Sequence, residues 1–565
     1  MKYIIIGAVA GGASTAARLR RLDEHAEIII FEKGEFISYA NCGLPYYIGD
    51  VIKDRNALFV QTAASFNRRF NIDVRTLTEV LSINSVSKTI TALNQITGLE
   101  YEESYDKLVL SPGAEPIRPP LPGITSEGIF TLRNVADTDY IKAFVQQKNT
   151  KKAVIIGAGF IGLEMAENLH DLGLEVSVIE MGNQILAPLD YPMAAIVQQH
   201  IRSKGVKLLL NAAVIGFEKT SSGINVLLKD GSSLEADIVL LSIGVKPDTK
   251  LAVNAGLKIG DAKGIWVNEF LQTSNPDIYA VGDAIEFTNP ITNKSMNTYL
   301  AGPANKQGRI CANNVVLGNL QKYNGAINTA IVKVFDLTVA TAGMASKHLE
   351  IAQIKHLVST THNGSHAGYY PGAKQMSIQI AFAPADGRIL SAQIAGYDGV
   401  DKRIDILSSA IKRNSTIYEL TEFEHAYAPP YSSAKDPINI AAFVAENILH
   451  DRLRVFYWNQ LDTISENDIL LDVRTKEEFE AGYIVNAINI PIDDLRERMH
   501  ELDQNKKIFI YCLGGLRGYL AQRILRQNNF QNVLNLSGGY QLWEACSNEL
   551  NENKSVEKRR LLAVQ

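Results

Sequence analysis

Two stretches of the chain repeat one order of apolar, small and polar residues. Each begins with an apolar run, at 2–6 and 152–156, and passes through a glycine-rich turn into helical periodicity. Each then returns as a second apolar run that ends on an acidic residue, at 27–32 and 175–180. A strand, a tight turn, a helix and a parallel strand in this order predict a dinucleotide-binding α/β unit. The pattern therefore predicts two such units.

Further apolar runs extend this organisation along the chain. The runs at 107–111, 238–242 and 273–283 predict strands that end in glycine-containing turns. A mixed α and β pattern without glycine fingerprints follows, and the last part returns to an α/β pattern. The expected boundaries are 1–113 with 245–325 for the first unit, 114–244 for the second, 326–445 for the mixed domain, 446–467 for a linker, 468–550 for the last domain and 551–565 for a charged, frayed tail.

Composition narrows the class of protein. A chain of 565 residues with 46% hydrophobic and 21% charged residues is typical of a globular protein of three or four domains. Its formal charge of −5 gives no general attraction to nucleic acid or anionic lipid. The apolar start fits a strand better than a signal peptide, and no apolar run reaches the roughly 20 residues of a membrane span. We therefore expect a cytoplasmic protein without membrane or nucleic-acid partners.

Four scattered cysteines argue against a disulfide framework. The chain contains no Cys-x-x-Cys pair, so a structural zinc site is not expected. We expect no metal. One or two of the thiols are expected to act chemically.

The second unit carries a complete fingerprint in Gly157, Gly159 and Gly162. These glycines permit a tight turn, close approach of a pyrophosphate and close helix packing, and the helix N-terminus offers free N–H groups. Glu180 ends the following strand, where it would accept hydrogen bonds from ribose hydroxyls and repel a 2′-phosphate. This unit is therefore expected to bind NADH rather than NADPH.

The first unit has Gly7 and Gly12, but Val9 replaces the middle glycine. Glu32 closes the unit, and Asp283 ends a later strand where it could hold a ribityl hydroxyl. Together these residues resemble the two-dinucleotide flavoprotein disulfide reductases, over residues 2 to about 320. The resemblance implies FAD on the first unit and a nicotinamide nucleotide on the second.

Cys42 stands in the sequence Asn-Cys-Gly-Leu-Pro, about ten residues after the ribose-binding strand. A predicted helix start at this point would stabilise its thiolate. Relatives of the glutathione reductase type keep two cysteines here, whereas this chain has one. Cys42 must therefore complete its cycle with an external thiol, a bound sulfur atom or a sulfenic acid. A buried, inert cysteine is the alternative interpretation.

This motif resembles that of the coenzyme A disulfide reductases, and still more that of their rhodanese-fused relatives. The resemblance implies a mixed disulfide between Cys42 and coenzyme A. Arg18 and Arg21 lie three residues apart on one predicted helix face and could reach one anion, although two solvated arginines fit equally well. The pocket implied for coenzyme A consists of Ser14, Arg18, Arg21, Ser38, Asn41 and Lys435.

Tyr369 and Tyr427 match tyrosines that, in this family, reach into the active site of the partner subunit. A phenol there could donate a proton to a leaving thiolate. The resemblance thus implies a homodimer formed through 326–445. Tyr370 and Tyr431 are neighbouring alternatives, and Tyr369 fits a core tyrosine equally well.

The last domain contains a predicted strand that ends in Asp-Val-Arg and, later, a Cys-Leu-Gly-Gly-Leu-Arg loop. In these two features it resembles rhodaneses. The loop from Cys512 to Arg517 can surround one sulfur atom with N–H groups and the guanidinium, which stabilises a thiolate or persulfide. The segment 482–491 departs from the family pattern and puts an edge loop in doubt. An inactive docking domain is the alternative. Cys311 and Cys546 carry no motif and are interpreted as structural.

The expected fold is α/β, with two Rossmann-like dinucleotide-binding domains, an α+β dimerisation domain and a C-terminal α/β rhodanese domain. The leading hypothesis is an NADH-dependent flavoprotein that reduces persulfides, polysulfides or coenzyme A persulfide and releases hydrosulfide. A coenzyme A disulfide reductase, an NADH oxidase or peroxidase, and a redox sensor with a docking rhodanese domain are the alternatives.

Overall fold

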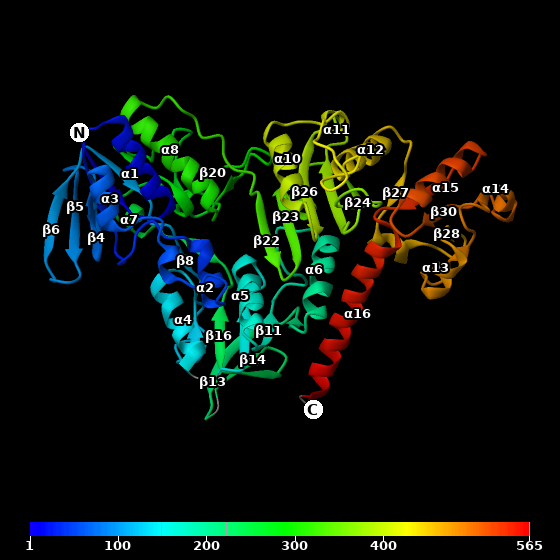
Figure 1. The fold of residues 1–565 in the computed structure, drawn as a ribbon, viewed down its shortest axis with the longest axis horizontal. Coiled ribbons are helices and arrows are strands. Elements are labelled where there is room, and N and C mark those ends of the chain that lie inside the picture. The colour runs from blue at the N-terminus through cyan, green and yellow to red at the C-terminus, as the bar shows by residue number, and fades with distance from the viewer. Residues whose placement is uncertain (148–149, 222, 564–565) are drawn as a thin grey trace. The chain divides into compact units, whose positions relative to one another are not determined.

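The structure is a computed structural model that describes residues 1–147, 150–221 and 223–563. Figure 1 traces its elements along the chain. The chain forms two compact units. Unit 1 comprises residues 1–181 and 212–328, and unit 2 comprises residues 182–211 and 329–565. In the part of the chain that the structure describes, no helix is both long and apolar enough to cross a membrane.

The first sheet of unit 1 is parallel and contains the strands expected for the first dinucleotide unit. Its order is β19-β7-β1-β2-β3, with β1 (Lys2–Ile6), β2 (Glu27–Phe31), β3 (Asp73–Arg75), β7 (Lys107–Leu110) and β19 (Ile278–Ala280). The apolar side chains of β1 and β2 are buried, as both faces of such a sheet require. Helices α1 (Ala10–Leu22) and α8 (Ala301–Leu317) pack closely, since a Cβ on Gly308 would lie 2.6 Å from the Gly11 carbonyl oxygen.

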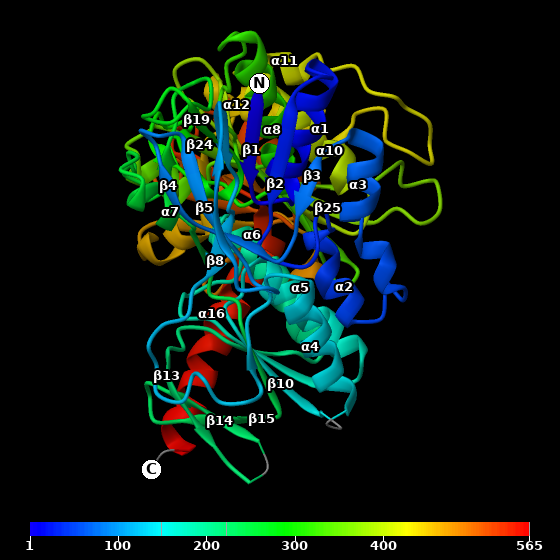
Figure 2. The same ribbon diagram turned by 90° about the vertical axis from the view of Figure 1, so that its left-hand side faces the viewer.

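The second parallel sheet of unit 1 contains the strands expected for the second dinucleotide unit. Four of its strands run in the order β11-β10-β16-β9, with β9 (Ile129–Phe130), β10 (Lys152–Ile156), β11 (Glu175–Ile179) and β16 (Ile238–Leu241). Helix α5 (Phe160–Asp171) packs on β10 and β11, and α4 (Val135–Gln147) lies nearby (Figure 2).

Smaller elements complete unit 1. Three antiparallel meanders or ribbons had no clear signal in the sequence: β4 (Thr78–Asn84), β5 (Thr89–Asn94) and β6 (Glu100–Ser104); β13 (Val214–Lys219), β14 (Ile224–Leu228) and β15 (Ser233–Ala236); and β8 (Ala114–Pro116) with β17 (Val245–Pro247). The remaining elements are η1 (Asn41–Gly43), α2 (Leu44–Ile48), η2 (Arg55–Leu58), α3 (Ala63–Phe70), α7 (Lys250–Asn254), β18 (Ile265–Trp266), η3 (Gly282–Ala284), β20 (Ile285–Thr288) and β21 (Ser295–Met296).

Unit 2 contains an antiparallel sheet in the region expected to be mixed α and β. Its order is β22-β23-β26-β25-β24, with β22 (Ala330–Val334), β23 (Leu337–Gly343), β24 (Leu357–Gly364), β25 (Gln375–Phe382) and β26 (Ile389–Gly396). Strand β26 is buried along its whole length because helices cover the sheet. The helices of this region and the segment 182–211 are α6 (Tyr191–Ser203), α9 (Ser346–Ile351), α10 (Val400–Lys412), α11 (Ile417–Thr421) and α12 (Pro437–Leu449), with strand β12 (Lys207–Leu209).

The C-terminal part of unit 2 is a five-stranded parallel sheet flanked by helices. The strand order is β27-β31-β30-β28-β29, with β27 (Val455–Phe456), β28 (Ile469–Asp472), β29 (Ile488–Asn489), β30 (Ile508–Tyr511) and β31 (Val533–Leu536). The other elements are η4 (Trp458–Thr463), α13 (Lys476–Ala481), α14 (Leu495–Arg498), η5 (Met499–Glu501), α15 (Leu516–Gln527) and α16 (Gly539–Ala563).

Two segments differ from their expected character. The segment 446–467, expected as a linker, supplies the end of α12 and the edge strand β27, whose Phe456 is buried in the last domain. The tail from 551, expected to be frayed, continues α16 to Ala563. Glu549 of this helix is buried against α6, where Arg202 and Gln198 donate to its carboxylate, and this contact explains why the helix is ordered there. Residues 564–565 lie outside the described part.

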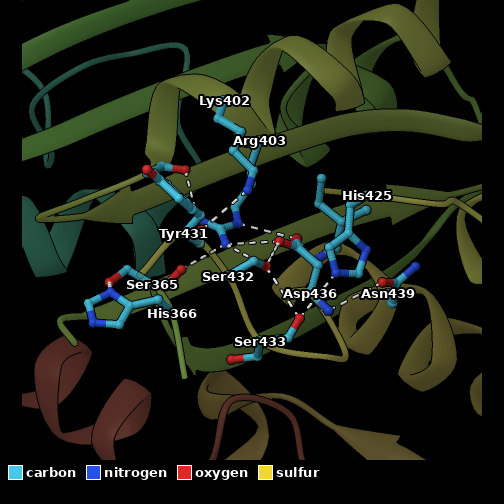
Figure 3. Close-up of polar contacts among 12 residues, drawn as sticks. Ser365, His366, Lys402, Arg403, His425, Tyr431, Ser432, Ser433, Asp436 and Asn439 are labelled. Carbon is cyan, nitrogen blue, oxygen red and sulfur yellow. Dashed lines mark hydrogen bonds and ion pairs between the residues drawn. The ribbon is translucent and has the colours of Figure 1, made fainter. Parts of the chain in front are cut away.

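A buried ion pair fastens two loops of unit 2 to α10. The Arg403 guanidinium donates through Nη2 to Asp436 Oδ2 and to the Ser365 carbonyl oxygen, each at 2.8 Å (Figure 3). Ser432 Oγ also donates to Asp436, at 2.6 Å. Burial by itself raises the pKa of the Asp436 carboxyl, but hydrogen bonds from Arg403, the Ile438 N–H and Ser432 outweigh burial and lower it. The pair thus joins the loop after β24 to the segment before α12.

Breaking this pair is expected to destabilise unit 2. Asp436→Asn or Arg403→Met leaves an uncompensated buried charge or donor, which costs about 3–5 kcal/mol. The expected result is a clear fall in the thermal midpoint of the unfolding transition that contains unit 2. The double variant Arg403→Met/Asp436→Leu should recover part of the loss. Arg498→Gln, which removes an exposed ion pair with Glu501, is the control and should leave the midpoint unchanged. Equal midpoints for the two single variants and this control would contradict the assignment.

Candidate functional site

The glycines of the first unit are required by close approach of the backbone. Gly7 has φ +95°, and a Cβ there would lie 2.1 Å from the Ser111 carbonyl oxygen. A Cβ on Gly12 would lie 1.8 Å from the Gly7 carbonyl oxygen. Glu32 Oε2 accepts from the Ala8 N–H at 2.9 Å, which places its carboxylate beside the glycine turn. The turn, the start of α1 and the acidic end of β2 therefore meet at one point, as a dinucleotide requires.

The second unit shows the same close approach and one informative difference. Gly157 has φ +98°, and a Cβ on Gly162 would lie 2.1 Å from the Gly157 carbonyl oxygen. A Cβ on Gly159 would meet nothing within 4 Å. Packing therefore does not require glycine at this position, whereas a pyrophosphate approaching the backbone does. Glu180 Oε2 accepts from the Ala158 N–H at 2.9 Å, so its carboxylate lies at the turn.

Buried polar atoms near the first unit fit a polar ligand. Asn41 Oδ1, Asn297 Oδ1 and Thr298 Oγ are buried and make no hydrogen bond to the residues that the structure describes. Asp283 lies in η3, and burial raises the pKa of its carboxyl although Arg133 opposes the change. Orphaned acceptors cost free energy unless a ligand satisfies them. These three unsatisfied atoms are therefore suited to a ligand with several hydroxyl or N–H donors.

Cys42 lies in η1, immediately before α2, and it is exposed. The helix start is at the predicted place. The groups around the sulfur, however, act against the thiolate. Although Cys42 is exposed, the protein atoms around its sulfur partly desolvate it and raise the pKa of the thiol, and the carboxylates of Glu164 and Asp283 raise it further. A helix of five residues is too short to offset these effects.

The sequence prediction did not include Glu164 and Tyr46. Tyr46 lies one helical turn after Cys42, and its hydroxyl donates to Glu164 Oε1 at 3.3 Å. Burial raises the pKa of Glu164 to about 7. A Cβ on Gly49 would lie 2.1 Å from Asn168 Oδ1, so α2 packs closely on α5. The helix that follows Cys42 is therefore held against α5, the helix that follows the glycine turn of the second dinucleotide unit. The sequence feature that could have identified Glu164 is its position two residues after Gly162, at the start of the helix that follows the glycine turn.

Several residues of the expected coenzyme A pocket lie together on α1. Ser14 Oγ donates to Asn305 Oδ1, and Arg18 Nε donates to Asn313 Oδ1 at 2.9 Å. Desolvation lowers the pKa of Arg18, and the charges of Arg309 and Arg21 lower it further. Arg309, on α8, was missed because nothing in the local sequence relates it to α1. A group of three cations favours an anionic ligand.

Ser38 and Asn41 lie near the glycine turn of the first unit. Ser38 adopts φ +45° and donates its N–H to the Ala8 carbonyl oxygen at 2.8 Å. Asn41, in η1, precedes Cys42 directly. Lys435 belongs to unit 2, where it lines an open pocket with Tyr427 and His425. Its role in the coenzyme A pocket stays a prediction.

The structure brings Tyr369 and Tyr427 together within unit 2. Their phenol oxygens lie 2.7 Å apart, and each can donate to the other. Tyr369 is 76% exposed and is therefore not a core tyrosine. Of the alternatives, Tyr370 packs its ring on His366, and Tyr431 is exposed.

The loop from Cys512 to Arg517 connects β30 to α15. The Gly515 N–H donates to Cys512 Sγ at 3.1 Å. Arg517 forms a bidentate ion pair with Glu478 of α13, with distances of 2.6 and 2.7 Å. Hydrogen bonds from Arg517 lower the pKa of Glu478 to about 2. Glu478 was missed because its link to the loop is apparent only once α13 is placed beside α15.

The other two cysteines are buried. Cys311 packs in the core of unit 1 and Cys546 beside Ala195 and Ala545 in unit 2. Burial raises the pKa of both thiols, so neither has thiolate character.

Comparison with known families assigns three parts of the chain. Residues 1–308, more than half of the chain, match the pyridine nucleotide-disulphide oxidoreductase family. The chain belongs to this family. Residues 329–437 match its dimerisation domain, and residues 458–546 match the rhodanese-like domain. The family implies FAD and NAD(H) as cofactors, and the two glycine turns fit them.

Three relatives are similar over most of the chain. Coenzyme A disulfide reductase of Staphylococcus haemolyticus is 38% identical over 79% of this chain and 100% of its own length. The crystal structure of reduced Bacillus anthracis CoADR-RHD is 47% identical, covers 97% of this chain and 98% of its own, and has a TM-score of 0.95. The structure of a NAD-dependent persulfide reductase from A. fulgidus is 37% identical, covers 96% and 100%, and has a TM-score of 0.90. This oxidoreductase is thus a disulfide or persulfide reductase fused to a rhodanese domain.

The raised pKa of Glu164 predicts a specific pH dependence of stability. The carboxyl binds a proton up to about pH 7 in the folded protein but only to its usual value of 4.5 in the unfolded chain. The folded state therefore holds more protons between these values, and its stability falls as the pH rises through them. Glu164→Gln removes this loss. The holoenzyme variant should melt above the wild type at about pH 8 and nearly with it at about pH 5. The exposed Glu175→Gln should show no such pH-dependent difference, and a constant difference for Glu164→Gln would contradict the prediction.

Proposed function

We propose that this oxidoreductase is an NADH-dependent reductase of persulfides, polysulfides or coenzyme A persulfide that releases hydrosulfide. The observation that carries the proposal is the combination of one redox cysteine, Cys42, with a separate sulfur-binding loop at Cys512 in one chain. A lone thiol suits a substrate that brings its own second sulfur atom. The similarity to the persulfide reductase from A. fulgidus over 96% of the chain supports this choice.

The proposed reaction breaks one S–S bond with two electrons. Cys42 attacks a persulfide at its outer sulfur, which releases a thiolate and leaves a Cys42 persulfide, or at its inner sulfur, which releases hydrosulfide and leaves a mixed disulfide. Bound FAD supplies the two electrons, which come from NADH, for breaking the new S–S bond and restoring the thiolate. Reduction of a Cys42 persulfide releases hydrosulfide, and reduction of a mixed disulfide releases the thiol.

The remaining site residues are proposed to bind and orient the substrate. Arg18, Arg21 and Arg309 provide the positive charge for the phosphate groups of coenzyme A, with Ser14, Ser38, Asn41 and Lys435 beside them. The Tyr369 and Tyr427 pair donates a proton to the leaving thiolate in the active site of the partner subunit of a homodimer. Cys512 carries sulfane sulfur, with Arg517 beside it.

A plain coenzyme A disulfide reductase is the second candidate, and the Staphylococcus haemolyticus relative favours it. That relative covers only 79% of this chain, over a match of 447 residues, and so leaves the rhodanese domain without a role. The Cys512 loop, with a donor at 3.1 Å from its sulfur, favours sulfane chemistry instead.

Replacing each cysteine separates the two proposed roles. Cys42→Ser should abolish NADH-driven release of hydrosulfide from every substrate, because a hydroxyl cannot form the S–S bond that must be broken. Cys512→Ser should abolish transfer of sulfur from thiosulfate or persulfides to the rhodanese domain but spare reduction of small substrates that reach Cys42 directly. The measurement is hydrosulfide release with coenzyme A persulfide and with a bulkier persulfide. The assignment is wrong if Cys42→Ser releases hydrosulfide at the wild-type rate, or if Cys512→Ser loses activity equally with all substrates.

The carboxylate of Glu180 is expected to set the choice of nicotinamide nucleotide. The wild type should turn over faster with NADH than with NADPH at matched concentrations, since the carboxylate repels a 2′-phosphate. Glu180→Gln should shrink the ratio of the two kcat/KM values about tenfold, which corresponds to ~1.4 kcal/mol. Glu175→Gln, at the start of the same strand, should leave the ratio unchanged. Preference for NADPH in the wild type would overturn the assignment.

A further inference from the structure

The entrance to the Cys512 loop is built from apolar side chains. Cys512 is only 2% exposed, so a sulfur donor must pass the side chains of the loop to reach its sulfur. Three leucines lie there, which we call the leucine rim: Leu513 is 42% exposed, Leu516 71% and Leu520 45%. Leu516 and Leu520 stand four residues apart and so share one face of α15.

Packing of the domain does not account for the leucine rim. Helix α15 buries its other face, with Ala521 and Leu525 in the core beneath the sheet. The leucine rim instead exposes apolar side chains to water, although burial of apolar surface is favourable. An apolar group bound at the entrance would recover part of this free energy.

The charges around the loop do not favour an anion. Arg517 is the only cation of the loop itself, and its guanidinium is already engaged by a bidentate pair with Glu478 and by Cys512. Helix α13, which supplies Glu478, also carries Glu477 and Glu480 against the single cation Lys476. This side of the entrance is therefore acidic overall. A dianionic donor would approach these acidic side chains, and the Arg517 guanidinium that it meets in the loop is already paired with Glu478.

We infer that Cys512 takes sulfur from organic persulfides whose carbon group is apolar and uncharged, in preference to thiosulfate. This inference rests on the proposed role of Cys512 as a carrier of sulfane sulfur. In the step, the Cys512 thiolate attacks the outer sulfur of R–S–S–H. The new S–S bond forms on Cys512, the old one breaks, and the group leaves as the thiolate R–S⁻, so that Cys512 becomes a persulfide that keeps the proton. The leucine rim holds R, and the Gly515 N–H faces the cysteine sulfur.

The test uses the full-length Cys42→Ser holoenzyme, in which Cys42 cannot react. Three donors are compared at equal concentration: butyl persulfide, mercaptosuccinate persulfide with two carboxylates, and thiosulfate. The readout is the rate at which Cys512 gains the mass of one sulfur atom, followed by mass spectrometry. Butyl persulfide should load Cys512 at least about tenfold faster than either anionic donor, which corresponds to ~1.4 kcal/mol.

Variants at the entrance should change this preference. Leu516→Arg places a free cation on the leucine rim, and Glu478→Gln releases Arg517 from its ion pair. Each should raise the rate with thiosulfate relative to butyl persulfide by about tenfold. Leu550→Arg, at a partly exposed leucine of α16, is the matched control and should leave the ratio unchanged.

The outcomes separate this inference from the proposed function. If no donor loads Cys512, its role as a sulfur carrier is wrong. If thiosulfate or mercaptosuccinate persulfide loads Cys512 as fast as butyl persulfide, the carrier role stands and the preference for uncharged donors is wrong. An unchanged donor ratio in both entrance variants would overturn the roles given to the leucine rim and to the Arg517–Glu478 pair.

Discussion

Contact between the backbone and a glycine in the first turn of a helix sets the geometry of both dinucleotide units. At Gly12 and Gly162 any side chain would lie within about 2 Å of a carbonyl oxygen of the preceding turn. Only glycine therefore allows the helix to start so close to its strand. The N–H groups at the helix start, the acidic end of the next strand and the helix packed alongside all follow from this approach. Cys42 depends on it too, because the helix that follows it packs on α5, which begins at the second glycine turn.

In unit 2 the exposed tyrosines lie on loops, and their positions depend on how these loops are held. Tyr369 lies after β24 and Tyr427 before α12, far apart in the sequence. The Arg403 guanidinium reaches both segments from α10, through the Ser365 carbonyl oxygen and the Asp436 carboxylate. A buried ion pair adds little to stability when compared with apolar residues of the same size, but it does fix an arrangement. Its benefit here is the position of the two loops, and with them the contact between the two phenols.

The sequence predicted what depends on local pattern and missed what depends on contacts between distant segments. The central strands of the two parallel sheets appeared as apolar runs because such strands are buried on both faces. The short edge strands β3 and β9 gave no such signal. The meander of β4, β5 and β6 has alternating, partly polar strands and gave no comparable signal. The glycines, Cys42, Cys512 and the tyrosine pair were named from their motifs. Glu478 and Arg309 were not, because each acts on a segment that only the fold places beside it.

The surroundings of Cys42 also come from distant segments and lead to a conclusion about proton balance. A helix start argues for a thiolate, but the Glu164 and Asp283 carboxylates oppose it, one from each dinucleotide unit. Since Glu164 titrates at about 7, it is partly protonated at neutral pH. The coupling is reciprocal: a proton on Glu164 removes one repulsion from the thiolate, and a negative charge on Cys42 strengthens the hold of Glu164 on its proton. The proton affinity of each group therefore depends on the charge of the other. Transfer of a proton from Cys42 to Glu164 costs less free energy than ionisation of the thiol beside a charged carboxylate.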